Sequence, residues 1–297
     1  MDSMKKLLQP LLLALAGIGL TACAARQDRL AQRQPGDLPT YEVYAIRYGV
    51  IPAFPVRALV AGADSTRTLD IALMVWLLRG PDGRNVLVDA GFFRDEHLAR
   101  WRVQEFVRPS EAIAKVGLRP EEITDIIITH LHWDHAGSIE LFPQARVWIQ
   151  EEEFRYYTSG EGRSGNTGVD PEDAALLLRL HDLGRVMLVD GDAREIIPGV
   201  RVYTGGRHTY ASQYVGVHTA DGTVVIASDN LYLYENLENH LPIAQTLDRE
   251  SNLQAQARMR ELATDPRLIV PGHDPEVFTR FPSPGSGVAR IELDGLP

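Results

Sequence analysis

Cysteine and an excess of positive charge are what this sequence lacks. Its 297 residues include one cysteine, which excludes an internal disulfide and any zinc site built from several cysteines. Lysine and arginine number 30 against 40 acidic residues, a net charge of −10, and this deficit argues against a nucleic-acid partner. We find no internal repeat or low-complexity stretch. The composition, 44% hydrophobic and 24% charged, is typical of a globular protein with one large domain.

The single cysteine, Cys23, lies directly after a segment that is typical of a secretory signal. Lys5 and Lys6 precede residues 7–20, which are almost wholly apolar but too short to cross a bilayer comfortably. The sequence Leu-Thr-Ala-Cys that ends at Cys23 resembles a bacterial lipobox. We therefore expect a lipoprotein-type signal peptide over residues 1–22 and a lipid on Cys23.

This N-terminal pattern also predicts the domain organisation and the location. Residues 23–40 are polar and would form a tether to a single catalytic domain over residues 41–297. Cleavage without lipidation and an uncleaved anchor both stay open as alternatives. The protein is accordingly expected in the cell envelope, either lipid-anchored or periplasmic or secreted, with no other contact to the membrane.

Short apolar runs alternate with helix-like segments along the rest of the chain. Ile71–Leu78 and Asn85–Asp89 are joined by Pro-Asp-Gly and predict a hairpin. Asp170 followed by Pro171 predicts a helix start, because Asp is favoured as a cap and Pro in the first turn. We expect further strands at 125–129, 146–150, 186–189, 200–204, 214–218, 223–228 and 268–270, and a long helix at 248–263. Many strands with few helices indicate two stacked sheets flanked by helices, an α/β fold of the αββα four-layer sandwich type.

Three histidines and an aspartate are concentrated in the segment Thr-His-Leu-His-Trp-Asp-His-Ala-Gly, residues 129–137, just after a predicted buried strand. On an extended segment, side chains two residues apart point the same way, so His130 and His132 can bind one ion. Asp134 and His135 lie one turn further on and can bind a second. Imidazole and carboxylate suit zinc or a similar divalent metal. A surface cluster of histidines beside a helix cap is the competing interpretation.

Three further candidates, His208, Asp229 and His273, each follow a predicted strand. A polar residue at the end of an apolar strand is a recurrent active-site position in α/β folds. Taken singly, each is equally well explained as an ordinary loop or turn residue. The other histidines lack such a setting, and we expect them on the surface or in loops: His97, His181, His218 and His240. The glycine-rich stretch 160–168 is expected to be a surface loop.

Together and in this order, these residues resemble the metallo-β-lactamase superfamily, from Tyr41 to the end of the chain. The resemblance implies one metal ion held by His130, His132 and His208, a second held by Asp134, His135 and His273, and Asp229 as a bridge. Asp89, at the end of an earlier strand, would orient a ligand. Two divalent ions are implied, with zinc expected although the ligands also accept iron, manganese or cobalt. Water between two such ions loses a proton near neutral pH, so hydrolysis is the expected chemistry.

Within the superfamily, the sequence looks most like the N-acyl homoserine lactone lactonases. Trp133 supplies an aromatic residue before the aspartate of the motif, and Tyr232 lies where that family has a substrate-activating tyrosine. The resemblance implies a quorum-quenching lactonase in which a metal-bridging hydroxide opens the lactone ring. Tyr232 and Asp134 would be the catalytic residues, the first stabilising the oxyanion and the second moving the proton. A core aromatic is the alternative interpretation of Tyr232.

Two departures from the lactonase pattern leave other functions open. From His208 the chain reads His-Thr-Tyr-Ala-Ser-Gln in place of the family's usual run His-Thr-Pro-Gly-His, and we match no N-terminal substrate contact in residues 41–65. Hydrolysis of another lactone, ester or thioester at the same site is one alternative. A non-catalytic envelope protein that stores or senses metal is another. The acyl-chain preference and the oligomeric state also stay open, a homodimer being one option.

Overall fold

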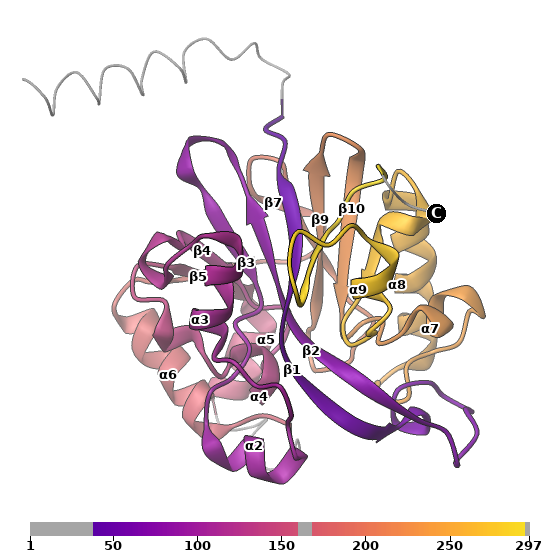
Figure 1. Cartoon of the computed structure of the whole chain (residues 1–297). Coiled ribbons are helices and arrows are strands. Elements are labelled where there is room, and N and C mark those ends of the chain that lie inside the picture. Colours follow the sequence, from indigo (N-terminus) through magenta and orange to yellow (C-terminus); the bar gives the residue numbers. More distant parts are fainter. Residues whose placement is uncertain (1–37, 160–167, 295–297) are drawn as a thin grey trace, which may run out of the picture. The chain divides into compact units, whose positions relative to one another are not determined.

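Two β-sheets pack face to face in the computed structural model, which describes residues 38–159 and 168–294 (Figure 1). The first sheet runs β12 (Val288–Arg290), β1 (Glu42–Pro55), β2 (Thr68–Arg79), β3 (Asn85–Val88), β4 (Asp125–Ile127), β5 (Arg146–Gln150) and β6 (Val186–Val189). The second runs β11 (Ile269–Pro271), β10 (Gly222–Ser228), β9 (Gln213–Thr219), β8 (Val200–Thr204) and β7 (Arg194–Ile197). Strands β3 to β6 are parallel to one another.

Helices cover the outer faces of both sheets (Figure 1). The first sheet carries α2 (Asp95–Trp101), α3 (Pro109–Ala112), α4 (Trp133–Ala136), α5 (Glu151–Thr158) and α6 (Pro171–Asp182). Beside the second sheet lie α7 (Tyr234–Glu238), α8 (Arg249–Leu262) and α9 (Val277–Arg280). This arrangement confirms the predicted αββα sandwich.

The strand β2 shows why the sequence folds into layers. Its side chains alternate, with Leu73, Val75 and Leu77 in the core under the helices of the first sheet. Met74 and Trp76 point the other way, into the core between the two sheets. A strand that is buried on both faces must be apolar throughout, which explains the unbroken apolar run in this part of the sequence.

Most predicted elements are confirmed, and the differences have local causes. Asp170 caps α6 as expected, its side chain accepting a hydrogen bond from the backbone N–H of Glu172 at 2.8 Å. Strand β1, the longest, was not predicted because glycine, arginine and proline interrupt its pattern and its pairing with β2 shifts register twice. The predicted hairpin is confirmed, since β2 and β3 pair antiparallel and Pro81–Gly83 forms a 3-10 turn between them.

The N-terminal predictions fall mostly outside the described residues. The signal peptide over 1–22, Cys23 and the tether up to residue 37 belong to that part of the chain. From Pro39 onward the chain forms one compact unit. No helix among residues 38–159 and 168–294 is long and apolar enough to cross a membrane.

Candidate metal centre

All seven predicted ligands come together at the ends of strands from both sheets. His130 and His132 lie on the extended segment after β4, and His132 is the N-terminal cap of α4. Asp134 and His135 lie in α4 itself. The other three follow strand ends as the sequence indicates: His208 after β8, Asp229 after β10 and His273 after β11.

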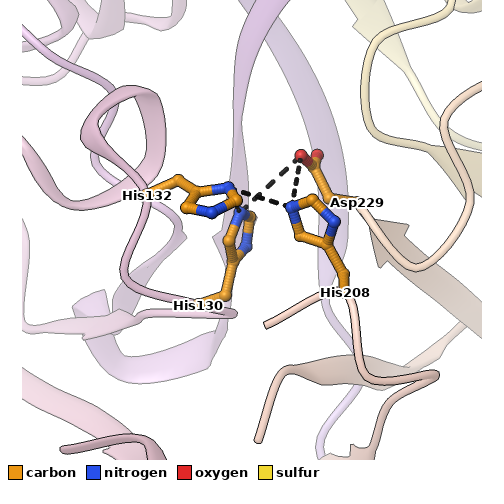
Figure 2. A group of neighbouring side chains, drawn as sticks. All are labelled: His130, His132, His208 and Asp229. Carbon is orange, nitrogen blue, oxygen red and sulfur yellow. Dashed lines mark hydrogen bonds and ion pairs between the residues drawn. The ribbon is translucent and has the colours of Figure 1, made fainter. Parts of the chain in front are cut away.

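The first group consists of His130, His132, His208 and Asp229, whose ligand atoms all lie within 4.8 Å of one another (Figure 2). Nδ1 of His132 lies 3.1 Å from Nε2 of His130 and 2.9 Å from Nε2 of His208. Oδ2 of Asp229 lies 3.3 Å from Nε2 of His208 and 3.6 Å from Nε2 of His130. Three imidazole nitrogens and one carboxylate oxygen thus converge on one point.

The second group consists of Asp134, His135 and His273. Oδ2 of Asp134 lies 3.6 Å from Nε2 of His135 and 3.7 Å from Nε2 of His273. The same two nitrogens lie 3.3 and 3.1 Å from Oδ1 of Asp229. Asp229 therefore turns one oxygen to each group, as a bridging carboxylate must.

In three of the histidines, a hydrogen bond made by Nδ1 on the outer side of the ring leaves Nε2 facing the centre. Nδ1 of His208 lies 2.7 Å from the carbonyl oxygen of Gln245, and Nδ1 of His273 lies 3.0 Å from that of Ala72. A carbonyl can only accept, so each Nδ1 carries the proton and each Nε2 presents a lone pair. Nδ1 of His135 donates to the carboxylate of Asp89 at 2.8 Å in the same way. Metal-binding histidines are held by their second nitrogen in this manner.

The nitrogen and oxygen atoms of the two groups are spaced as ligands of divalent cations, and not as hydrogen-bond partners of one another. Lone pairs at the distances given above repel, and Nε2 of His135 and Oδ1 of Asp229 are buried without a hydrogen-bond partner among the described residues. Tetrahedral zinc with bonds of about 2.0–2.1 Å places its ligand atoms about 3.3 Å apart, close to these spacings. The residues thus form a His/Asp metal site, while the assignment of each side chain as a ligand stays a prediction.

The electrostatics differ between the two groups. Burial lowers the pKa of His130 well below its usual value, and it lowers that of His208, so both are neutral as ligands must be. Burial also acts to lower the pKa of His135 and His273, but Asp229 and other carboxylates outweigh it and raise both. Burial acts to raise the pKa of Asp229, yet His135 and His273 hold it well below its usual range. The negative potential that attracts a proton to the second group attracts a cation equally.

Asp89 holds His135 in place and joins the strand ends around it, as the resemblance implies. Its Oδ1 accepts from the backbone N–H of Thr129 at 2.8 Å, and its Oδ2 accepts from the hydroxyl of Ser228 at 2.9 Å. Oδ2 also holds His135, so one buried carboxylate joins the ends of β3, β4 and β10. Asp89 and Ser228 both have a positive φ, 61° and 47°, a strain that structures retain chiefly at functional sites.

Comparison with known proteins agrees with this geometry. The family model described as the metallo-β-lactamase superfamily matches residues 73–273. This chain belongs to the metallo-β-lactamase superfamily.

The similar proteins within the superfamily include lactonases. An N-acyl homoserine lactonase of a Bacillus species is 28% identical over 225 residues, covering 70% of this chain and 83% of its own length. An N-acyl homoserine lactonase of Bacillus cereus is 32% identical, covering 55% of this chain, and the chain spans 61% of that relative's length. These relatives support a metal-dependent hydrolase.

Solved structures agree on the metallo-β-lactamase fold. The crystal structure of a quorum-quenching N-acyl homoserine lactone lactonase superposes with a TM-score of 0.67 at 23% identity, covering 81% of this chain and 95% of its own. A dizinc quorum-quenching lactonase in complex with the product N-hexanoyl-L-homoserine gives 0.62 at 13% identity, covering 88% and 100%. At these identities the likeness shows the fold alone.

A cavity of about 160 Å³ opens onto the metal centre of this superfamily member. Its polar lining includes His132, Asp134, Asp229, Tyr232 and His273. Its apolar wall consists of Ile51, Phe54, Leu59, Ile71, Trp101 and Trp133. Three of these wall residues, Ile51, Phe54 and Leu59, come from segment 41–65, in which the sequence alone let us match no substrate contact of the lactonases. Nothing in their spacing marks them, since β1 and the turn after it bring them to the site.

Tyr232 belongs to the polar lining of this cavity and is 3% exposed. Its hydroxyl oxygen lies 3.3 Å from Nδ1 of His208, whose proton already points to Gln245 at 2.7 Å. The hydroxyl proton is therefore left to donate elsewhere. Burial raises the pKa of Tyr232 well above its usual value, and Asp229 and Asp134 raise it further, so the phenol stays protonated. Its ring also packs in the core, as the alternative interpretation of Tyr232 expects, while its catalytic role stays a prediction.

Two side-chain groups near the site were not predicted. His97, expected on the surface, is 9% exposed, stacks on Trp133 at 4.5 Å and contacts Asp170 at 3.1 Å through Nε2. It faces inward because α2 packs its own His97 and Trp101 against the same indole. The other is Glu153, a fully buried carboxylate.

His218 lies half-buried on β9, not in a loop. Residues 160–167 of the expected surface loop lie outside the described part of the chain.

Proposed function

We propose that this chain is a dinuclear metal-dependent hydrolase that opens the lactone ring of N-acyl homoserine lactones. The observation that carries the proposal is the mixed lining of the cavity, which combines residues of the metal centre and Tyr232 with aliphatic and aromatic side chains. An acyl homoserine lactone has the matching two parts, a polar ring ester and an alkyl chain. The names of the relatives described above, N-acyl homoserine lactonases, support the same substrate class.

The metal centre would activate both the ester and the attacking water in the proposed reaction. Two divalent cations held by the two groups would polarise an ester carbonyl and lower the pKa of water toward neutrality. The side chains of the two groups would hold these cations, and Asp229, which faces one oxygen to each group, would contribute to both sites. Zinc is our proposed metal, because imidazole and carboxylate are ligands it commonly takes.

Tyr232 and Asp134 complete the proposed mechanism. The Tyr232 hydroxyl, protonated and free to donate, lies in the cavity where it can stabilise the negative charge that develops on the carbonyl oxygen. Asp134 also lines the cavity, with 13% of its side chain exposed, so it can reach the ring oxygen. We assign it the transfer of a proton, taken from the attacking water, to that oxygen as the bond between the carbonyl carbon and the ring oxygen breaks. The apolar wall would bind the acyl chain and exclude water from the site.

A substrate panel tests this proposal directly. Purified zinc-loaded protein is offered acyl homoserine lactones of increasing chain length, a simple aryl ester and an acyl thioester, and acid release is followed by indicator. We expect the lactones to be hydrolysed fastest, a chelator to stop the reaction and added zinc to restore it. Faster turnover of the thioester or the aryl ester would favour the alternative hydrolase. No chelator-sensitive turnover of any substrate would leave metal storage or sensing as the better account.

We also propose that the protein is exported and anchored by a lipid on Cys23. The basic residues, the apolar run and the position of the only cysteine support this. Fractionation of cells that produce the full chain or its Cys23→Ser variant tests it. The wild type should sediment with membranes and incorporate labelled fatty acid, and the variant should incorporate none; equal incorporation in both, or none in the wild type, would refute the anchor.

A further inference from the structure

Glu153 is a buried carboxylate that neither the ligand set nor the cavity wall includes. It lies in the first turn of α5 and has no exposed surface. Burial raises its pKa to about 7, against three hydrogen bonds that lower it. An ionisable group is seldom kept in such a place without a partner of opposite charge, so its contacts need an explanation.

Three hydrogen-bond donors converge on this carboxylate. Oε1 accepts from the backbone N–H of Leu131 at 3.0 Å and from the hydroxyl of Thr209 at 2.7 Å. Oε2 accepts from the backbone N–H of Ala211 at 2.7 Å. Leu131 lies between the ligands His130 and His132 in the chain, and Thr209 directly follows the ligand His208. Glu153 thus joins the two segments that carry all three histidines of the first group.

The second group has a different set of supports. His135 is held by Asp89 and His273 by the carbonyl of Ala72, and neither contact involves Glu153. The same turn of α5 makes one more link to the first group, since the side chain of Gln150 donates to that of Gln213 at 3.0 Å. The backbone N–H of Gln213 in turn donates to the carbonyl of Thr129, beside His130, at 2.8 Å. The start of α5 therefore supports one half of the centre selectively.

We propose that Glu153 is a positioning residue for the first metal group, holding the segment of His130 and His132 at a set distance from the segment of His208. It touches neither ion nor substrate. This inference rests on the two-metal centre of the proposed function.

Only a carboxylate satisfies all three donors. Both oxygens of Glu153 accept, and no acceptor requires a donor from it. In Glu153→Gln, one oxygen becomes an amide NH₂ of nearly the same size, which must face either the N–H of Ala211 or the donors of Leu131 and Thr209. The variant keeps the packing and breaks the hydrogen bonding. It therefore distinguishes the effect of these hydrogen bonds from the effect of side-chain volume.

The experiment measures zinc affinity of each group without using turnover. Chelator-stripped protein is titrated at pH 8 against a zinc indicator in two backgrounds. His273→Ala removes a ligand of the second group and so reports on the first; His132→Ala reports on the second. Glu153→Gln should weaken zinc binding about 10- to 100-fold in the His273→Ala background and less than threefold in the His132→Ala background.

Matched variants extend the comparison. Thr209→Val removes one donor at constant volume and should weaken the first group in the same direction, whereas Thr209→Ser keeps the hydroxyl and should leave its affinity unchanged. Glu152→Gln, an exposed neighbour on the same helix, should also leave it unchanged. Unchanged affinity in both backgrounds, or an equal loss in both, would overturn the inference. Failure of the proposed function is distinguishable, because the selective loss of zinc can be present whether or not the wild type hydrolyses lactones.

Discussion

Replacing Tyr232 by phenylalanine tests the proposed chemistry with the least disturbance of the structure. The ring keeps its contacts with His208 and His273, at centroid distances of 5.5 and 5.8 Å. His208 keeps its hydrogen bond to Gln245 at 2.7 Å, so its orientation toward the centre is unaffected. The variant therefore loses one hydroxyl from the cavity and should keep its metal and its fold.

The size of the effect follows from what that hydroxyl would do. A hydrogen bond to a charged group contributes roughly 1.5–3 kcal/mol, which corresponds to about one to two orders of magnitude in rate. Because the donor acts on the charge that forms during reaction, kcat should fall while KM changes little. Since burial keeps the phenol protonated, the loss should be the same across the working pH range of the enzyme.

Steady-state kinetics with an acyl homoserine lactone measure this effect, and zinc content is determined on the same samples. Tyr234→Phe is the matched control, because the Tyr234 hydroxyl is buried, has no hydrogen-bond partner in the described chain and lies outside the cavity lining. It should react at the wild-type rate. A kcat for Tyr232→Phe within twofold of the wild type, at full zinc content, would refute a catalytic role for Tyr232.

Two other variants probe the cavity wall and the buried charges near it. Phe54→Ala shortens the apolar wall, so kcat/KM for a decanoyl lactone should fall about tenfold more than for a butanoyl lactone, given roughly 0.8 kcal/mol per buried methylene; an equal loss for both would remove Phe54 from chain recognition. Burial raises the pKa of Asp173 from 3.8 to about 7, although Arg94 opposes the shift. The folded state holds this proton more tightly than the unfolded chain does. Protonated Asp173 therefore stabilises the fold by roughly 4 kcal/mol below pH 4, and this stabilisation is lost as the pH rises through 7. Asp173→Asn cannot ionise, so its melting temperature relative to the wild type should rise between pH 5 and 8; a constant difference would contradict the raised pKa.

The ligands could be predicted from the sequence because their geometry is local. His130, His132, Asp134 and His135 fall within six residues, and one strand end followed by one helical turn places all four. His208, Asp229 and His273 are dispersed, but each follows an apolar strand, and strand ends of two packed sheets meet at one edge. A short-range pattern and a simple rule of topology therefore indicated the candidate residues, and the resemblance to the superfamily supplied their division between two ions.

The cavity wall and the supporting carboxylates could not be predicted in this way. Phe54 and Leu59 reach the site because β1 extends past its register shifts, which depend on pairing with β2. Glu153 reads as one of three glutamates at a helix start, and only the tertiary structure turns it inward while Glu152 faces solvent. His97 has an ordinary surface-helix sequence around it, and its burial depends on contact with Trp133 from another helix. Long-range packing decides these positions, and a single sequence carries no local sign of it.

The zinc content of the purified protein tests the central claim most directly. The wild type is stripped, reconstituted with zinc, freed of unbound metal and analysed for zinc per chain, beside the Asp229→Ala variant. Because Asp229 faces one oxygen to each group, the account predicts two ions per chain in the wild type and fewer in the variant. A wild type that holds one ion or none after reconstitution, or a variant that still holds two, would contradict it.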